Sequence, residues 1–240
     1  AACGPGGAGV AVARDDGDVS LHDASGAVAG TFDAHDASVR AVAAMARDAC
    51  VSGDANGVVH LWAPGSSPSP TATYRDHDGA VAAVAAADPL VATGGDDGRL
   101  VVRDARTAGA PAATWQFDAS VCGLAFFGGP NFSGGDHLVV GLGDGRLASI
   151  QMGRQSPQMV VRCAATGASV RALAVRPGAN DASAFAAGAD DGGLRVATLS
   201  SSNAEAAAHT DYCRGLAWLG PNALATGGWD GVVRAWTVED

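Results

Sequence analysis

The feature that most constrains this chain is a pattern that occurs six times along its 240 residues. Each copy consists of a short apolar run, a turn rich in glycine and aspartate, and a second apolar run. The turn glycines lie 40, 41, 47, 47 and 39 residues apart, at Gly17, Gly57, Gly98, Gly145, Gly192 and Gly231. Such a period indicates a chain built from successive copies of one small structural unit.

The rest of each period supplies two more strands. Before five of the six turns an apolar segment precedes the pattern, at 39–42, 81–84, 121–126, 170–175 and 213–218. A short fourth strand follows each turn, for example at 71–74 and 114–117. No window predicts an amphipathic helix, because glycine, proline and aspartate interrupt the chain too often. The sequence therefore predicts an all-β fold, a β-propeller of six visible repeats that occupies residues 1–240 as one domain.

The predicted propeller is incomplete at its ends. The first visible strand, near Val10, is the second strand of its blade, and the last blade stops after its third strand, at Trp236. Residues 1–8 are too rich in glycine and proline to predict a good strand. Closing strands are therefore expected upstream of Ala1, and the complete protein is expected to have six or seven blades.

Charge narrows the class of partner. The chain has 15 basic and 25 acidic residues, a net charge of −10, and no lysine. A surface that follows nucleic-acid phosphates needs a basic cluster, which this sequence lacks, so we expect no nucleic acid. The apolar runs are shorter than the ~18 residues of a membrane span. The negative field favours basic partners such as arginine-rich tails.

The sequence gives no support for covalent chemistry. Its five cysteines form no CxxC pair, which favours buried reduced thiols in a cytoplasmic or nuclear protein. Its glycine-rich turns lack the lysine of a P-loop, no helix pattern follows them, and the histidines lack metal-ligand spacing. We expect no enzyme activity, no catalytic residue, no cofactor and no metal.

A histidine, a hydroxyl, a turn acid and a tryptophan recur in register, and this pattern resembles the WD-repeat family. In that family the four side chains form a buried hydrogen-bonded set in each blade. The resemblance implies three such sets: His209, Thr226, Asp230 and Trp236; His35, Ser52, Asn56 in the aspartate position, and Trp62; and His77, Thr93 and Asp97, with Arg103 in the tryptophan position. The other repeats keep mainly a turn acid, at Asp16, Asp144 and Asp191. A histidine near a hydroxyl and an aspartate also suggests a hydrolase triad, but recurrence in several blades favours a structural role.

Among WD-repeat proteins the chain resembles the methylosome protein 50 family, the partners of the type II protein arginine methyltransferase. The likeness covers residues 9–238 and is strongest at 209–214 and at Gly228-Trp229-Asp230. It implies a non-catalytic adaptor that binds the methyltransferase and helps to present arginine-rich substrates, such as histones or Sm proteins. The alanine enrichment and the unseen N-terminal portion depart from that family.

Partner-binding residues are expected on the face formed by the loops that enter each first strand and by the turns between second and third strands. Trp229 is the leading candidate, because it places an aromatic ring in a tight turn; its alternative is a ring folded over its own blade. The remaining candidates are Tyr212, Arg214, Arg40, Arg171, Asp36 and Asp211. For each arginine the alternative is an ion pair with neighbouring Asp36 or Asp211.

Two rival functions stay open. Another WD-repeat scaffold, such as a nucleoporin, a ubiquitin-ligase adaptor or a trafficking subunit, would share every blade signal. A WD-repeat esterase such as a diphthine methylesterase would need a Ser/His/Asp group that does not repeat, and the sequence shows none.

Overall fold

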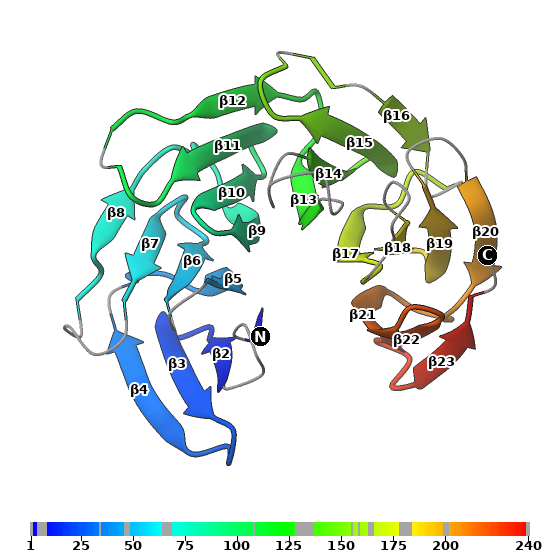
Figure 1. Cartoon of the computed structure of the whole chain (residues 1–240), viewed down its shortest axis with the longest axis horizontal. Helices are drawn as coiled ribbons and strands as arrows, with labels where there is room; N and C mark the ends of the chain where they lie inside the picture. The colour runs from blue at the N-terminus through cyan, green and yellow to red at the C-terminus, as the bar shows by residue number, and fades with distance from the viewer. Residues whose placement is uncertain are drawn as a thin grey trace. The chain divides into compact units, whose positions relative to one another are not determined.

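The computed structural model describes residues 2–3, 9–33, 35–45, 49–63, 69–107, 109–127, 137–154, 156–157, 159–162, 166–177, 184–198 and 202–238. These residues form antiparallel strands, and none of them is helical (Figure 1). In the same part of the chain, no helical segment has the length and apolarity needed to cross a bilayer. The strands assemble, in chain order, into five four-stranded sheets and one three-stranded sheet.

The chain divides into two compact units, Ala1–Val121 and Cys122–Asp240. The first unit contains three sheets, which we call blades 1 to 3. Blade 1 comprises β1 (Ala2–Cys3), β2 (Gly9–Ala13), β3 (Asp18–Asp23) and β4 (Val28–Asp33). Blade 2 comprises β5 (Val39–Ala44), β6 (Cys50–Asp54), β7 (Val59–Trp62) and β8 (Ala72–Tyr74). Blade 3 comprises β9 (Val81–Ala87), β10 (Leu90–Gly95), β11 (Arg99–Asp104) and β12 (Ala113–Gln116).

The second unit contains blades 4 to 6. Blade 4 comprises β13 (Val121–Phe127), β14 (His137–Leu142), β15 (Arg146–Gln151) and β16 (Met159–Arg162). Blade 5 comprises β17 (Val170–Val175), β18 (Phe185–Ala189), β19 (Gly193–Ala197) and β20 (Ser202–Ala207). Blade 6 has three described strands, β21 (Cys213–Gly220), β22 (Ala223–Gly228) and β23 (Val233–Thr237).

The predicted all-β blade pattern is confirmed. All six turn glycines have positive φ, between 75° and 98°, and each N–H closes a turn onto the carbonyl three residues earlier. Gly57 shows why no larger residue fits, since a Cβ there would lie 2.5 Å from the carbonyl oxygen of His77. A left-handed conformation combined with this close approach leaves glycine as the residue that suits the turn.

The start of the chain departs from expectation. Residues 1–8 were expected to make a poor strand, yet Ala2 and Cys3 pair with Ala11 and Val10 as β1. The glycines and the proline follow Cys3 in the sequence, so this strand precedes the residues that disfavour pairing. Among the described residues, the sheet of the last blade ends at its third strand, β23.

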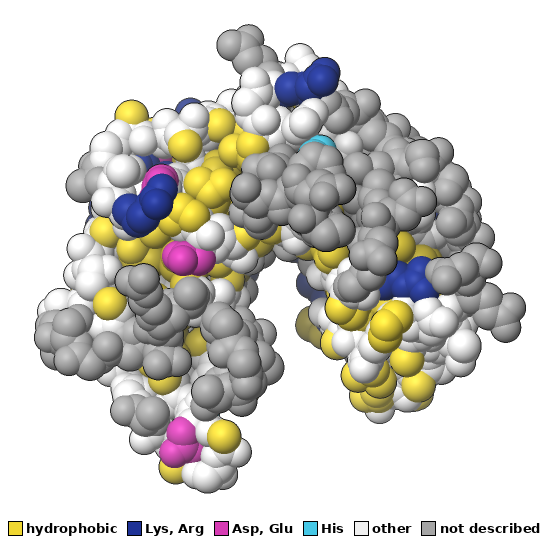
Figure 2. All heavy atoms as spheres, in the orientation of Figure 1, with side chains coloured by type: hydrophobic (Ala, Val, Ile, Leu, Met, Phe, Trp, Pro, Cys, Tyr) yellow, Lys and Arg dark blue, Asp and Glu magenta, His cyan; other side chains and the backbone are white. Residues whose placement is uncertain are grey.

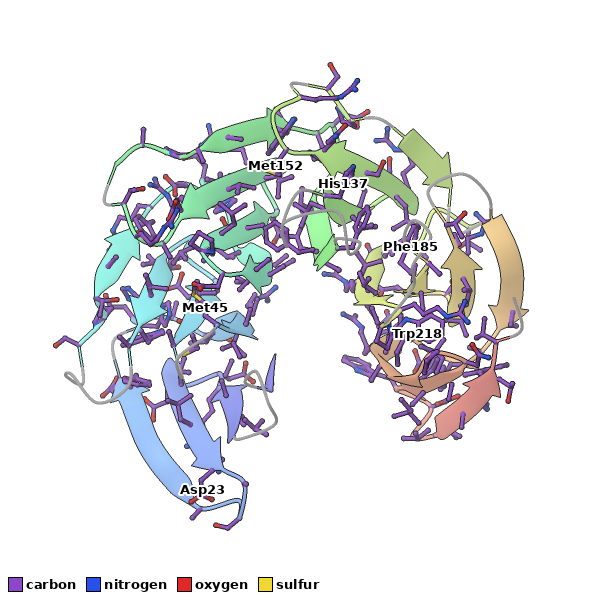
Figure 3. The ribbon with its side chains drawn as sticks, viewed as in Figure 1. Asp23, Met45, His137, Met152, Phe185 and Trp218 are labelled. Carbon is purple, nitrogen blue, oxygen red and sulfur yellow. The ribbon has the colours of Figure 1, made fainter. Side chains whose placement is uncertain are left out.

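Within each unit, apolar side chains of neighbouring blades form the core. Phe32 and Trp62 belong to a cluster shared by blades 1 and 2. Phe185 belongs to one shared by blades 4 and 5, and Leu224 with Trp218 to one shared by blades 5 and 6 (Figure 3). The indole N–H of Trp218 also donates to the carbonyl oxygen of Ala174, at 3.1 Å. The large side chains of these clusters fill space at the seams that the small residues of this sequence would leave empty.

Candidate functional site

Blade 2 contains a buried hydrogen-bonded set of four side chains. His35 precedes β5, Ser52 lies on β6 and Trp62 on β7. His35 Nε2 is 2.7 Å from Ser52 Oγ, and Nδ1 is 2.9 Å from Asp54 Oδ2. A carboxylate only accepts, so Nδ1 carries the ring proton and Nε2 accepts the serine proton. The indole N–H of Trp62 donates to the same Ser52 Oγ, at 2.7 Å.

The acid in this set is Asp54, so the expectation that Asn56 fills the aspartate position is wrong. The Asn56 side chain is exposed in the turn. Asp54 Oδ1 accepts the backbone N–H groups of Asn56, at 2.9 Å, and of Val58, at 2.8 Å. One carboxylate therefore closes the turn and holds the histidine.

Blade 3 contains the same histidine–carboxylate pair, but its aspartate stands at a different position of the repeat. His77 Nδ1 is 3.2 Å from Asp97 Oδ1, and Nε2 is 2.8 Å from Thr93 Oγ1. Gly95 occupies the position of Asp54, and a Cβ there would lie 2.6 Å from both His77 Nδ1 and Asp97 Oδ1. Because Gly95 has no side chain, the carboxylate of Asp97, two residues later, fits beside the His77 ring.

Blade 6 follows blade 3. His209 Nδ1 is 2.9 Å from Asp230 Oδ1, and Nε2 is 2.8 Å from Thr226 Oγ1. The Trp236 indole N–H donates to Thr226 Oγ1, at 3.0 Å. Gly228 leaves room for the carboxylate in the same way, because its Cβ would meet the His209 ring.

Burial and hydrogen bonding shift the pKa values of His35 and Asp230. Burial lowers the pKa of His35, and the nearby Asp54 carboxylate opposes that shift only in part, so the ring is neutral near pH 7. Burial acts to raise the pKa of Asp230, but hydrogen bonds from His209 and from other N–H donors outweigh it and hold that pKa well below its ordinary value. The blade 2 pair is therefore a hydrogen bond between a neutral imidazole and a carboxylate.

The three sets have the connectivity of a hydrolase triad, but the hydroxyls lie deep inside the blades. Ser52, Thr93 and Thr226 are 0%, 5% and 1% exposed. Ser52 and Thr226 also accept an indole N–H while bonded to a histidine. An oxygen buried and bonded in this way cannot meet a substrate, so the sets tie loops to strands.

Blades 1, 4 and 5 keep the turn part of this arrangement, and in blade 5 the Thr166 hydroxyl, at the position of the histidine, donates to Asp191 Oδ2 at 2.6 Å. Asp16 accepts the N–H of residue 18 at 3.2 Å, Asp144 that of residue 146 at 3.2 Å, and Asp191 that of residue 193 at 3.0 Å. In these hydrogen bonds an aspartate closes its own turn two residues on. The aspartate of the repeat thus stabilises a turn with or without a histidine beside it.

Arg103 takes a different role from the tryptophan it replaces. Its guanidinium binds the Asp76 carboxylate through two hydrogen bonds, each 2.7 Å long. It also lies over the Tyr74 ring, with Cζ 4.2 Å from the ring centroid. The cation therefore packs on the fourth strand of blade 2 instead of bonding to Thr93.

Three predicted partner-binding residues meet on the surface of blade 6, and we call Tyr212, Arg214 and Trp229 the aromatic cluster. The Tyr212 and Trp229 rings lie 5.2 Å apart, and Arg214 Cζ is 4.8 Å from the first ring centroid and 5.2 Å from the second. The Trp229 backbone N–H donates to the Tyr212 carbonyl oxygen, at 3.0 Å. Trp229 nevertheless stays 67% exposed.

Arg171 and Arg214 lie beside Asp190, an acid that the sequence analysis did not single out. Asp190 Oδ2 accepts Arg171 Nε at 3.0 Å, and Asp190 Oδ1 lies 3.4 Å from Arg214 Nε. The expected alternative partners, Asp36 and Asp211, are not the ones that these arginines contact. A signal was present, because Asp190 holds in its turn the position that Trp229 holds one blade later.

The remaining candidates are dispersed. Asp36 and Arg40 are exposed in the first unit, and no ion pair joins them among the described residues. Asp211 is exposed beside the aromatic cluster, and its Oδ1 accepts the Tyr212 N–H at 2.7 Å.

Cys50, Cys122 and Cys213 are buried free thiols, and burial raises the pKa of Cys50 to about 12 and that of Cys213 to about 11. The side chains of Cys3 and Cys163 lie outside the described part. In the part that is described, no group of three or more His, Cys, Asp or Glu side chains could hold a metal ion.

Comparison with known proteins agrees with this geometry. The family model described as "WD domain, G-beta repeat" matches residues 26–63, 68–104 and 201–237. These segments contain the second, third and sixth turns, which are the repeats with a histidine–hydroxyl–acid set. The chain therefore contains WD40 repeats, and its fold is that of a WD-repeat β-propeller. A search of curated proteins finds no match.

Solved structures agree on the fold. A chain from the crystal structure of the mitotic checkpoint complex superposes with a TM-score of 0.86 at 22% identity, over 99% of this chain and 73% of that one. The computationally designed Ika8 protein gives a TM-score of 0.77 at 22% identity, over 99% of this chain and 70% of that one. At this identity the likeness shows the fold alone.

Proposed function

We propose that this protein is a non-catalytic adaptor and that the aromatic cluster is a contact surface for a protein partner. The observation that carries the proposal is the position of Trp229, which stays 67% exposed although its ring lies against Tyr212 and Arg214. A ring folded over its own blade would be covered. Tryptophan, tyrosine and arginine are also the residues that contribute most to interface energies.

The aromatic cluster is preorganised for binding. The backbone bond between Trp229 and Tyr212, together with the stacked Arg214, limits the freedom that these side chains would lose on association. Arg214 Nε lies 3.4 Å from Asp190, longer than a good N–H···O bond. Among the described residues no acceptor bonds its terminal nitrogens, so these can bind a partner carbonyl or carboxylate.

The finer proposal is that the partner is a protein arginine methyltransferase and that the adaptor, in the cytoplasm or nucleus, helps to present arginine-rich substrates. It is supported by the resemblance of residues 209–214 and 228–230 to the methylosome protein 50 family. The net charge of −10 agrees in sign, because an acidic protein attracts basic tails at long range.

The test compares two exposed apolar residues of blade 6, Trp229 inside the cluster and Leu219 outside it, at 67% and 68% exposure. Proteins captured from native extract are purified and titrated against the wild-type chain, Trp229→Ala and Leu219→Ala. Truncating a central aromatic costs about 2 kcal/mol or more, so we expect about 30-fold weaker binding for Trp229→Ala and little change for Leu219→Ala.

Equal affinities for the two variants would overturn the aromatic cluster as the contact surface. Capture of pore, ligase or coat subunits in place of a methyltransferase would keep the adaptor and discard the finer proposal. Turnover of a generic methyl ester, abolished by one point mutation, would replace the adaptor with an esterase.

A further inference from the structure

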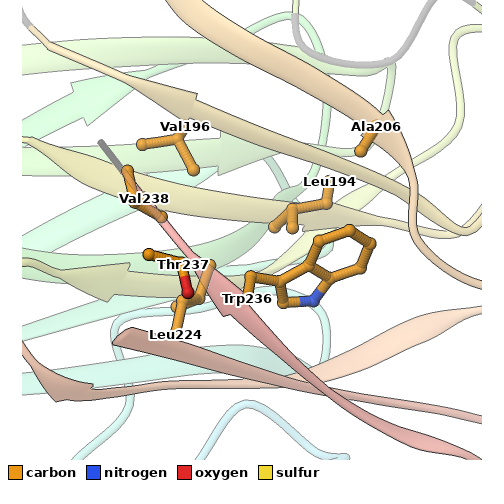
Figure 4. Close-up of a pocket in the computed structure, with 7 residues that line it drawn as sticks. All are labelled: Leu194, Val196, Ala206, Leu224, Trp236, Thr237 and Val238. Atoms are coloured by element: carbon orange, nitrogen blue, oxygen red, sulfur yellow. The ribbon is translucent and has the colours of Figure 1, made fainter. Parts of the chain in front are cut away.

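A cavity of about 330 Å³ lies between strands of blades 5 and 6 (Figure 4). Its lining includes Leu194, Ala206, Leu224 and Trp236. Among the described residues no acid, base or thiol lines this cavity, so it supplies no reacting group. The turn between β6 and β7 in blade 2 differs, because it contains a chemically labile pair of residues.

The labile pair is Asn56 and Gly57, the one Asn-Gly sequence in the 240-residue chain. Asparagine is a thermolabile residue, since the backbone nitrogen of the next residue can attack its side-chain amide. A glycine in that next position has no side chain to obstruct the attack. The sequence of this turn therefore favours loss of the Asn56 amide group.

Both reacting groups are available in the structure. The Asn56 side chain is exposed, and among the described residues nothing hydrogen-bonds to its amide. The Gly57 N–H donates to the Asp54 carbonyl oxygen at 3.3 Å, which is longer than a good N–H···O bond. The attacking nitrogen is therefore weakly held, and the amide that it would attack is in contact with water.

Two other contacts hold the turn and slow the reaction. Asp54 Oδ1 accepts the Asn56 N–H at 2.9 Å. Gly57 is buried, and a Cβ there would lie 2.5 Å from the carbonyl oxygen of His77, so little room surrounds its backbone. For the attack, the bond between Cα and the carbonyl carbon of Asn56 must rotate, and these contacts oppose that rotation. We expect conversion to be slow in the folded chain and faster whenever the turn opens.

We propose that Asn56 is a site of spontaneous deamidation in the folded protein. The Gly57 nitrogen bonds to Asn56 Cγ, the Cγ–Nδ2 bond breaks, and ammonia leaves with the proton that the Gly57 nitrogen gives up. Water then opens the cyclic imide. Opening at Cγ leaves aspartate, whereas opening at the backbone carbonyl carbon leaves isoaspartate, in which the chain runs through Cβ and Cγ. In sum, an amide and a water molecule become a carboxylate and ammonium.

The product carries a carboxylate at the position where two other blades have theirs. Asn56 stands directly before the turn glycine, as do Asp97 in blade 3 and Asp230 in blade 6. Those two carboxylates bond to the histidine of their own blade. Blade 2 already has Asp54 beside His35, so deamidation adds a second negative charge near this histidine, which favours its protonated form. The turn also belongs to the face on which the sequence predicts partner contacts, so the reaction changes the charge of that face.

Peptide mass spectrometry measures the reaction with a control inside the same chain. Trypsin releases residues 48–75, whose sole asparagine is Asn56. It also releases residues 215–234, whose sole asparagine is Asn222. Asn222 is likewise exposed, but an alanine follows it and Arg176 donates to its side-chain oxygen. In the folded wild-type chain at mildly alkaline pH, we expect deamidation of Asn56 to be about tenfold or more faster than that of Asn222, which corresponds to a barrier lower by about 1.4 kcal/mol.

The chain unfolded in guanidinium chloride supplies the positive control, because its turn is open. Absence of conversion at Asn56 in the folded chain would overturn the proposal, and conversion in the unfolded chain alone would assign the reaction to that state. Equal rates at Asn56 and Asn222 in the folded chain would overturn it as well. The rate should rise with pH, because the attacking nitrogen must lose a proton, and a rate independent of pH would contradict the imide route. Asn56→Gln, whose longer side chain forms the imide less readily, should lose most of the conversion.

The effect of the product on blade 2 is measured with a permanent carboxylate. Asn56→Asp copies the product, and Asn222→Asp adds the same charge at the control position. Raising the pKa of His35 toward its value in the unfolded chain reduces the stability that is lost on acidification. The fall in melting temperature below about pH 6.5 should therefore be smaller in Asn56→Asp than in Asn222→Asp. An equal fall in the two variants would overturn the action of the new carboxylate on His35.

Discussion

Replacing Asp54 with alanine tests how blade 2 is held together. The change leaves His35 Nδ1–H and the backbone N–H groups of Asn56 and Val58 without their acceptor. The side chains of His35 and Asp54 are 0% and 1% exposed, so water cannot easily replace the carboxylate beside the histidine. Leaving buried donors unpaired costs about 1–3 kcal/mol each, and the broken buried pair puts the total at about 3–5 kcal/mol. Urea unfolding, followed by tryptophan fluorescence and circular dichroism, measures the loss.

Two companion variants decide whether the reasoning holds. Asn56→Ala should change stability little, because that side chain is exposed. Asp54→Gly combined with Asn56→Asp copies the Gly95 and Asp97 arrangement of blade 3, and it should regain most of the stability lost in Asp54→Gly alone. A loss from Asn56→Ala that equals the loss from Asp54→Ala would refute the assignment of the acid, and so would the absence of rescue in the double variant.

Three other outcomes follow from the same contacts. Burial lowers the pKa of His35 below its ordinary value of 6.5, so at acidic pH the unfolded chain binds more protons than the folded chain. The free energy of unfolding should therefore be retained above about pH 6.5 and fall below it, which is measured as a lower melting temperature. Arg103→Ala removes a half-buried bidentate pair and should cost about 1–3 kcal/mol in urea unfolding, whereas Arg106→Ala, at an exposed pair, should change stability little. Cys50 and Cys213, with thiol pKa values raised by burial to about 12 and about 11, should react with iodoacetamide only at the rate of unfolding; fast alkylation of the folded chain would contradict their burial.

The sequence predicted the blades well because their signals are local. A glycine with positive φ is needed at each turn, and the alternation of apolar residues on either side determines which face is buried. The strand expected at 170–175 is β17. The two-residue strand β1 was missed because pairing with β2 outweighed the poor strand propensity of residues 1–8.

The candidate site was less predictable, because its contacts depend on the room around each side chain in three dimensions and not on the spacing of residues in the sequence. The carboxylate of Asp54 reaches His35 from two positions before the expected residue, and only the three-dimensional room left by Gly95 in blade 3 shows that both routes are equivalent. Arg171 and Arg214 share Asp190, an acid in the turn of blade 5, whereas sequence proximity pointed to Asp211. Arg171 and Asp190 lie in the same blade, whereas Arg214 contacts Asp190 from the next blade, and a contact between blades leaves no pattern within one repeat.

Blade 6 contains a complete hydrogen-bonded set but also exposes more large apolar side chains than the other blades. The strand register explains this exposure. Of the six exposed large apolar residues among those described, five lie on this blade: Tyr212, Leu219, Trp229, Val232 and Val233. Figure 2 shows hydrophobic side chains gathered over blade 6, at the lower right of the view. Val233 is 79% exposed, whereas Val19, Val59, Leu100, Leu147 and Leu194, which stand at the same register position of the other blades, are at most 4% exposed.

The side chains are of the same kind, so the difference lies in their neighbours: each of those five faces a fourth strand, and Val233 faces none among the described residues. Covering an apolar side chain of this size contributes about 1.5 kcal/mol or more. A further strand beside β23 would cover Val233 in the way that the fourth strands cover those five, while His209, Thr226, Asp230 and Trp236 hold the three described strands together.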